Sequence, residues 1–349
     1  MKKILFIVLV FCSWLSLKAQ NEATEVITQK GVTLYHYDKI YYKITDNENK
    51  EVMTVDPTNY GLLAPETWFY CYVEVNLPEK ISIEGEDYTV TAIDSSCFKV
   101  LTEPCTISST VKVIGHSNDM SWVPTIEFGL GVEAIESSCL SRCYFETLNL
   151  PLNIISLGEH CVNDNDFLKT VDIPDGLTSI GAKSFSNNKQ LESIILPGSL
   201  QYVGYDSFNN NPSLKSVTLD AEIKDFEWGF NKCPAIERIE FTGHPSSSYP
   251  ELFFRSSFLD IDTNKCVLIV PDGTKNYYKN IFSQYDYPLA KLQILEKSEE
   301  AASAGAVISD KSRVEVSRYT TDGVQVDENY KGIVIIQYSD GTTAKRFVE

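Results

Sequence analysis

Two short groups of residues in this 349-residue chain have types and spacings that chemistry could use. His160 directly precedes Cys161, and a cysteine beside a histidine base can act as a nucleophile. The run from Asn163 to Asp166 alternates amides and carboxylates, as calcium loops do. An EF-hand loop needs glycine at its sixth place and glutamate at its twelfth. Counted from Asp164, those places hold Lys169 and Asp175, so only a weak surface cation site remains open here.

Other catalytic arrangements find no support in the sequence. The remaining histidines, His36, His116 and His244, are scattered, and no motif assembles a Ser–His–Asp order. No glycine-rich phosphate loop leads from a strand into a helix. A glycosidase needs a pair of carboxylates, but no pair is singled out by spacing. The sequence therefore predicts a protein that is not an enzyme and that uses no cofactor or metal.

These residues belong to successive copies of one sequence repeat. Apolar and asparagine positions between residues 168 and 188 recur 23 places later, between residues 191 and 211. A fixed period of 20–29 residues with an L-x-x-L-x-L core indicates a leucine-rich repeat solenoid. The matched positions are Leu168, Val171, Ile173, Leu177, Ile180, Phe185 and Asn188, followed by Leu191, Ile194, Leu196, Leu200, Val203, Phe208 and Asn211.

Two columns of apolar residues extend the repeat to about eight coils. We expect the first column to be a strand in each coil and the second to fill the opposite wall of the core. The predicted fold class is mainly β, with a β-rich N-terminal cap, a C-terminal cap of helix and strand, and a small C-terminal β domain. The first column runs Ile126, Leu148, Val171, Ile194, Val217 and Ile239, and the second runs Ile93, Ile114, Ile135, Leu157, Ile180, Val203 and Phe226.

Most of the chemically distinctive residues fall into columns of the same repeat. Cysteine is a common small buried residue, and an inward asparagine can bond backbone groups at a turn. We therefore interpret both columns as packing, which disfavours Cys161 as a nucleophile and zinc binding in general. An even cysteine count in an exported chain favours disulfides, so pairing stays open. The first column is Cys97, Cys139, Cys161, Ser184 and Ser207, and the second is Cys143, Asn165, Asn188, Asn211 and Cys233.

The ends of the chain predict export. Lys2 and Lys3 precede an apolar run, and Ala19 follows it, which is the pattern of a signal peptide. A membrane anchor is the alternative, but the run is shorter than the roughly 20 residues that span a bilayer. We expect a signal peptide at 1–19, the N-terminal β cap at 20–70, the solenoid with its C-terminal cap at 71–295, a linker at 296–306 and the small β domain at 307–349.

One face of the strand column is the expected binding surface. Because side chains alternate along a strand, the residues between the inward ones line one sheet face, and solenoids bind through such faces. A solvated face without a ligand is the alternative. The outward residues are Glu127, Asn149, Asp172, Ile195, Thr218 and Glu240.

Charge narrows the class of partner. The formal net charge of −18 repels phosphate backbones, so we expect no nucleic acid. We expect an extracellular protein or a glycan as partner, and no membrane span in the mature chain. A rival hypothesis is a sugar-binding protein or enzyme accessory that uses aromatic end regions, which otherwise serve as caps. A third is a scaffold that only carries another domain. The end aromatics are Tyr35, Tyr37, Tyr41, Tyr42, Trp68, Phe69, Tyr70, Tyr277 and Tyr278.

The segments Asp175–Phe185 and Gly198–Phe208 resemble the BspA-like bacterial leucine-rich repeat family, whose repeat ends in I-G-x-x-A-F-x-x-C/N. Here cysteine or serine replaces the usual alanine, and the resemblance covers about residues 71–271. It implies a location on the surface of a bacterium, adhesion to host or neighbouring cells, and no catalytic residues. Residues 313–348 are similar to the C-terminal sorting domain of type IX secretion, which implies release or display at the outer surface.

Overall fold

The structure is a computed structural model, and it describes most of the predicted solenoid. The described residues are 23, 25–29, 32–37, 40–55, 75–97, 103–117, 120, 122–219, 224–226, 228–243, 257–283, 288–303, 315–320, 325–327, 330–338 and 343–348. The expected signal peptide, Cys71 and the aromatics Trp68 to Tyr70 lie outside them. The chain divides into two compact units, 1–296 and 297–349, and each is considered by itself.

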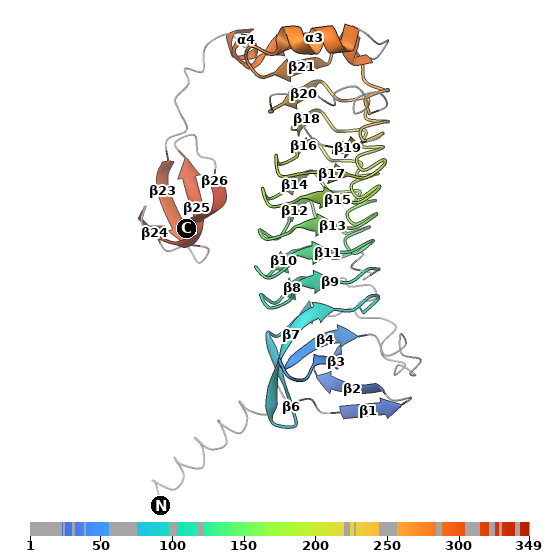
Figure 1. The fold of residues 1–349 in the computed structure, drawn as a ribbon, viewed down its shortest axis with the longest axis vertical. Coiled ribbons are helices and arrows are strands. Elements are labelled where there is room, and N and C mark those ends of the chain that lie inside the picture. Colours follow the sequence, from blue (N-terminus) through green and yellow to red (C-terminus); the bar gives the residue numbers. More distant parts are fainter. Residues whose placement is uncertain are drawn as a thin grey trace, which may run out of the picture. The chain divides into compact units, whose positions relative to one another are not determined.

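The second column of the repeat forms one continuous parallel sheet in unit 1 (Figure 1). Each strand pairs with the strand of the next coil, and Ile180 lies opposite Val203, as the period requires. The predicted solenoid is therefore confirmed, with seven such strands among the described residues. They are β7 (Glu86–Ile93), β9 (Val113–Ile114), β11 (Ala134–Ile135), β13 (Ser156–Leu157), β15 (Ser179–Ile180), β17 (Tyr202–Val203) and β19 (Lys224–Phe226).

The first column also pairs in parallel, but it is divided among three sheets. Their orders are β10-β8-β5, then β12-β14, then β16-β18-β20-β21-β22. Cys105 lies opposite Ile126, so the irregular segment before residue 122 is a true coil. The strands are β5 (Val75–Asn76), β8 (Cys105–Ile107), β10 (Ile126–Phe128), β12 (Thr147–Asn149), β14 (Thr170–Asp172), β16 (Ser193–Ile195), β18 (Ser216–Leu219), β20 (Arg238–Phe241), β21 (Val267–Val270) and β22 (Gln293–Glu296).

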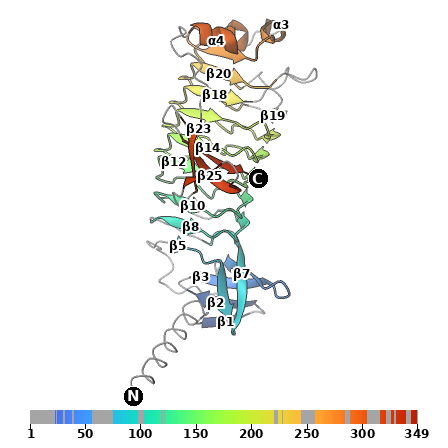
Figure 2. The ribbon, with the colours of Figure 1, turned by 90° about the vertical axis from the view of Figure 1, so that its left-hand side faces the viewer.

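The N-terminal cap extends the sheet that is formed by the second column of the repeat. Strands β1 (Glu25–Gln29), β2 (Val32–Tyr37), β3 (Ile40–Asp46) and β4 (Glu51–Val55) form an antiparallel meander, and β4 pairs in parallel with β7. Figure 2 shows these strands beyond β7, at one end of the stack. Within the first coil, β6 (Lys80–Ile83) folds back on β7 as an antiparallel hairpin. The cap therefore covers the apolar end of the first coil, as solenoids require.

The C-terminal cap contains the expected helix and strand. Helix α3 (Lys275–Ser283) and the 3₁₀ helix η3 (Pro288–Lys291) lie between β21 and β22. Tyr278 of α3 is fully buried, and its ring centroid lies 5.3 Å from that of Phe241. The amphipathic helix thus closes the core above the last coils.

Unit 2 contains a small antiparallel sheet, as expected for the C-terminal β domain. Its strands are β23 (Glu315–Thr320), β24 (Gln325–Val326), β25 (Gly332–Tyr338) and β26 (Thr343–Val348), in the order β24-β23-β25-β26. The structure differs from the expected linker, because Lys297–Ser303 forms helix α4. Lysine, glutamate and alanine favour a helix, and this preference outweighs the small, featureless composition of the segment.

Identical side chains stack from coil to coil inside the solenoid. The buried rings of Phe185, Phe208, Phe230 and Phe258 have neighbouring centroids 5.3, 5.0 and 5.0 Å apart. Phe258 follows an insertion that hides the repeat in the sequence. Parallel strands are about 4.8 Å apart, so each ring meets its equivalent in the next coil. The coil spacing therefore determines the core packing.

An asparagine ladder runs beside these rings. The backbone N–H of Asn165 donates to Asn188 Oδ1 (2.9 Å), and the N–H of Asn188 donates to Asn211 Oδ1 (2.7 Å). The Asn188 amide also donates to the Phe185 carbonyl (3.0 Å). All three side chains are fully buried. The predicted role of this column in bonding the backbone at the turns is confirmed.

A glycine after the second strand brings adjacent coils into close approach. A Cβ added at Gly158, Gly181 or Gly204 would lie 2.4, 2.5 or 2.4 Å from a backbone nitrogen of the preceding coil. Atoms of different coils cannot approach so closely, so any side chain here pushes two coils apart. By contrast, the nearest atom to a Cβ at Gly176 would be 3.6 Å away.

We predict that Gly181→Ala lowers the free energy of unfolding by about 1–3 kcal/mol, the usual cost of overpacking. Gly176→Ala is the matched control and should change it by less than about 0.5 kcal/mol, as surface substitutions usually do. Urea denaturation followed by circular dichroism measures both values. Equal stabilities of the two variants would contradict the close approach of the coils.

Candidate functional site

The adjacent residues His160 and Cys161 do not form a catalytic pair. Cys161 is fully buried, and its Sγ lies 3.9 Å from the Ile135 carbonyl oxygen. His160 Nδ1 instead lies 3.2 Å from the Asn163 side-chain amide. Burial raises the pKa of the Cys161 thiol well above its ordinary value, which disfavours the reactive thiolate. The packing interpretation of Cys161 is therefore the one that its surroundings support.

The other described cysteines share this environment. All of them are buried: Cys97, Cys105, Cys139, Cys143, Cys161, Cys233 and Cys266. Burial raises the pKa of Cys105, Cys233 and Cys266 to about 12. Cys139 donates to the Gly115 carbonyl (3.0 Å) and Cys143 to that of Met120 (3.1 Å), each in the preceding coil. These thiols are packing residues, and no disulfide joins them.

The segment from Asn163 to Asp166 distributes its side chains in different directions. Asn165 points inward as part of the ladder, whereas the Asp166 carboxylate forms an ion pair with Lys189 (2.9 Å). Asp164 Oδ1 accepts a hydrogen bond from the Asn187 amide (2.8 Å). Among the described residues, no three His, Cys, Asp or Glu side chains are grouped closely enough to hold a metal ion. The polar residues of this segment therefore stabilise the turn and the contacts between coils.

The residues predicted to form the strand face are mostly accessible. Glu127, Asn149, Asp172 and Ile195 are exposed, and the Ile195 side chain is 66% exposed. Asn149 lies opposite Asp172 across β12 and β14. Ile195 lies opposite the half-buried Thr218 across β16 and β18. The repeat therefore brings outward residues of neighbouring coils into register.

Glu240 is the exception on this face. It is only 9% exposed, and its Oε2 lies 2.9 Å from Nη2 of Arg238 on the same strand. Strand alternation correctly places Glu240 opposite Thr218, but alternation does not tell whether neighbouring side chains cover an outward residue. The accessible strand face is consequently Glu127, Asn149, Asp172, Ile195 and the partly exposed Thr218.

The aromatic end regions support capping where their side chains are described. Tyr41 and Tyr42 in β3 and Tyr278 in α3 are buried. Tyr35 and Tyr277 are partly buried and pack against the core. The buried rings of Tyr41, Tyr42 and Tyr278 have no free face for a sugar, so these residues serve the caps rather than the site that the rival hypothesis requires.

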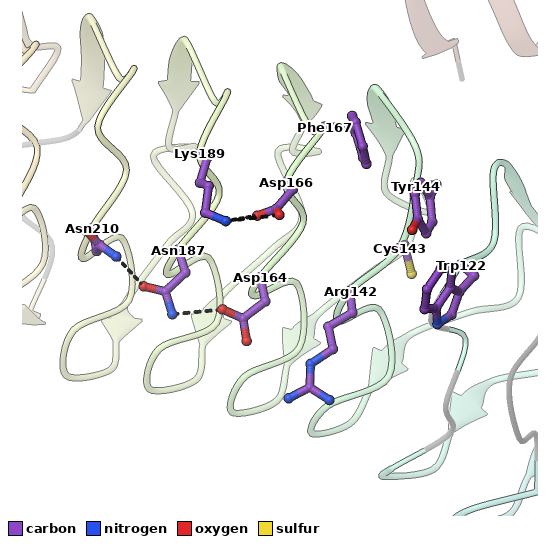
Figure 3. A pocket seen from close by; sticks show the side chains of 10 residues that line it. All are labelled: Trp122, Arg142, Cys143, Tyr144, Asp164, Asp166, Phe167, Asn187, Lys189 and Asn210. Atoms are coloured by element: carbon purple, nitrogen blue, oxygen red, sulfur yellow. Dashed lines mark hydrogen bonds and ion pairs between the residues drawn. The ribbon is translucent and has the colours of Figure 1, made fainter.

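A groove on the turns that lead back to the strand column was not predicted. Its volume is about 500 Å³. Figure 3 shows aromatic rings at one end and a row of polar side chains along it. Its lining residues are Trp122, Arg142, Cys143, Tyr144, Asp164, Asp166, Phe167, Asn187, Lys189 and Asn210. We call this feature the turn groove.

The backbone of the turn groove explains why its polar side chains point outward. Arg142, Asp164, Asn187 and Asn210 occupy equivalent places and have φ angles of 59°, 58°, 63° and 61°. Asparagine and aspartate tolerate this left-handed conformation better than most residues. Each N–H donates to a carbonyl of the following coil, at 2.8–3.1 Å. A recurrent polar residue at this spacing was the sequence signal for the groove.

We predict that the described cysteines resist alkylation in the folded chain. At pH 8 a thiol whose pKa is about 12 is almost entirely protonated, whereas an unfolded cysteine with a pKa of about 8.5 is partly thiolate. Iodoacetamide should therefore label Cys105 and Cys233 only after denaturation, as peptide mass spectrometry will show. The same result is expected for Cys161, because burial also raises the pKa of its thiol. Rapid labelling of Cys161 under native conditions would restore it as a candidate nucleophile.

Comparisons with known proteins agree with this geometry. The model of the "BspA type Leucine rich repeat region" matches in six copies that together cover residues 91–287. No protein with curated annotation matches the chain. Within the described residues, no helix is long and apolar enough to cross a membrane.

Several solved structures of bacterial leucine-rich repeat proteins are similar to parts of the chain. A leucine-rich repeat protein of T. pallidum is 18% identical over 58% of this chain and 81% of its own, with a TM-score of 0.38. The pneumococcal vaccine antigen PcpA is 14% identical over 79% and 99%, with a TM-score of 0.27. A leucine-rich cell surface protein of Faecalibacterium prausnitzii is 12% identical over 79% and 95%, with a TM-score of 0.29.

Such low TM-scores carry no argument by themselves, whereas the family match covers more than half of the chain. The residues that match the family also contain the stacked strands, the glycines at which adjacent coils approach closely, and the asparagine ladder. This chain belongs to the BspA type leucine-rich repeat family.

Proposed function

We propose that this chain is exported, resides outside a bacterial cell and binds an extracellular protein through the strand face without transforming it. The observation that carries the proposal is the arrangement of Glu127, Asn149, Asp172 and Ile195, which are exposed on paired strands of a continuous core. Family membership and the leader pattern at 1–19 support the location. The burial of the cysteines and the contact of His160 with Asn163 rather than with Cys161 support a binding role rather than catalysis.

The chemistry of the strand face favours a partner that carries an apolar group beside basic groups. Ile195 supplies an exposed apolar side chain, and binding hot spots concentrate where apolar groups are fully desolvated. Glu127 and Asp172 add negative charge, in keeping with the net charge of −18. Complementary charge speeds association and sets specificity more than it raises affinity. Adhesion to host or neighbouring cells is one role that such binding would serve.

Unit 2 has a different role in this proposal. It contains its own four-stranded sheet and forms a separate compact unit. These properties suit a C-terminal signal that directs the chain to a type IX secretion apparatus, as the similarity of residues 313–348 suggests. Removal of this unit should then block export and leave the binding of the solenoid intact.

A triple variant tests the strand face directly. We expect Glu127→Ala, Asp172→Ala and Ile195→Ala together to weaken binding to an extracellular protein at least tenfold, because the exposed apolar side chain and the neighbouring acidic groups are lost. Surface plasmon resonance of the chain without residues 1–19, against a panel of extracellular matrix and cell-surface proteins, measures the affinity.

The matched control removes two acids and one apolar residue outside the strand face. Glu133→Ala, Glu159→Ala and Leu259→Ala affect exposed residues and should leave both the affinity and the thermal unfolding of the chain unchanged. Wild-type affinity of the strand-face triple variant for every protein that binds the parent chain would rule out this surface.

A further inference from the structure

We propose that the turn groove binds an oligosaccharide chain laid across successive coils. This inference goes beyond the proposed function, because the groove lies on the turns and shares no residue with the strand face. It rests on three observations: an exposed aromatic stack, a recurrent row of hydrogen-bonding side chains, and a backbone whose own hydrogen bonds are already made.

The aromatic part of the groove is a stack that remains open to solvent. The centroid of Tyr144 lies 5.1 Å from that of Trp122 and 5.1 Å from that of Phe167. The ring planes are tilted by 33° and 23°, in contrast with the 7° between the buried Phe185 and Phe208. The side chains of Trp122, Tyr144 and Phe167 are 53%, 40% and 42% exposed.

Exposure of three neighbouring aromatic rings is costly in water. Large apolar patches on soluble proteins usually mark interaction sites. Each of the buried phenylalanines in the core is almost completely covered by its neighbours, so the fold can bury stacked rings where they serve only for packing. The Trp122–Tyr144–Phe167 stack therefore presents apolar surface to a ligand. The C–H faces of a sugar ring fit such a surface.

The polar part of the groove presents donors and acceptors in register. The Asn210 amide donates to Asn187 Oδ1 (2.7 Å), and the Asn187 amide donates to Asp164 Oδ1 (2.8 Å). Arg142 occupies the next equivalent place and is exposed. Figure 3 shows this row extending from Asn210 to Arg142. These side chains offer fixed partners for hydroxyl groups, each of which both donates and accepts.

Two features favour a sugar chain over a peptide. The N–H groups of Arg142, Asp164, Asn187 and Asn210 are bonded to the following coil, so the groove has no open sheet edge that an added peptide strand could use. Its lining also combines aromatic rings with a row of amide, carboxylate and basic side chains, which suits the apolar faces and the hydroxyl groups of a sugar. The ligand must then be recognised by aromatic rings and polar side chains.

The charges and spacing of the groove fit the same ligand class. Arg142 and Lys189 balance Asp164 and Asp166, and Lys189 forms an ion pair with Asp166. Equivalent residues recur once per coil, and the 5.1 Å between ring centroids is comparable to the length of one sugar residue. A linear glycan would therefore meet aromatic rings at one end of the groove and polar side chains, one set per coil, along the rest. The volume of the turn groove, about 500 Å³, falls within the range of roughly 300–1,000 Å³ common for ligand sites.

Binding of defined oligosaccharides to the chain without residues 1–19 tests the proposal. An array should carry neutral hexose chains in one arm and chains with uronic or sialic acids in the other. Isothermal titration calorimetry then measures the affinity of the soluble oligosaccharides that bind. We expect Tyr144→Ala to weaken binding at least tenfold, since it interrupts the aromatic stack.

Tyr205→Ala is the matched control, because Tyr205 is 49% exposed and lies outside the groove. It should leave the affinity unchanged. Thermal unfolding of both variants separates a lost contact from a lost fold. Arg142→Gln distinguishes the two arms: it should weaken acidic chains much more than neutral ones if the guanidinium binds a carboxylate.

Two results would overturn the proposal: no binding in either arm of the array, or binding that survives in a folded Tyr144→Ala variant. The strand-face triple variant should retain its affinity for the oligosaccharide. Failure of the glycan experiment would leave protein binding by the strand face intact, and failure of the strand face would leave the groove intact.

Discussion

Hydrogen bonding between successive coils is the constraint on which the rest of this structure depends. A buried backbone amide needs a partner, and in a solenoid that partner belongs to the next coil. Adjacent coils must then approach to the spacing of paired strands. Gly181 permits the approach, because a Cβ there would lie 2.5 Å from the backbone. Asn188 satisfies the amide of Asn165 where the chain turns. The spacing between coils follows from repeating these contacts.

The same constraint determines which residues can take part in function. Cysteine and asparagine, which are candidates for catalysis or metal binding in many proteins, are buried here where they bond the backbone of a neighbouring coil. Outward side chains are not needed for these hydrogen bonds between coils. They gather into long surfaces, because equivalent residues are separated by only one coil spacing. The strand face and the turn groove are both surfaces of this kind. They are suited to extended ligands that contact many weakly binding residues at once.

The interior of the solenoid could be predicted from sequence because its columns repeat. The register of Ile180 with Val203, the packing role of Cys161 and the ladder of Asn188 all follow from periodicity. Burial on the outer faces could not be predicted in this way. Glu240 has the right alternation, yet Arg238 covers its carboxylate.

The turn groove escaped prediction for a related reason. Asp164 and Asn187 look like ordinary turn residues, and Trp122 precedes Arg142 by 20 residues rather than 22 or 23, which removes it from the column. The helix Lys297–Ser303 and the stacking of Phe258 after an insertion were also missed. Phe258 stacks on Phe230, which is 28 residues earlier rather than one period away, whereas the helix lies outside the repeat and reflects local helix propensity.

Deletion of one whole period tests this account most directly. Removing residues 189–211 joins Asn188 to Pro212 and preserves every column, because Asn211 precedes Pro212 in the parent chain. We predict a single cooperative unfolding transition and an unchanged β circular dichroism spectrum per residue, with a modest loss of stability, since nearest-neighbour contacts dominate in a solenoid. Removal of 189–200, about half a period, should abolish cooperative unfolding. If the whole-period deletion were as disruptive as the half-period deletion, the register of the coils would not be what holds this protein together.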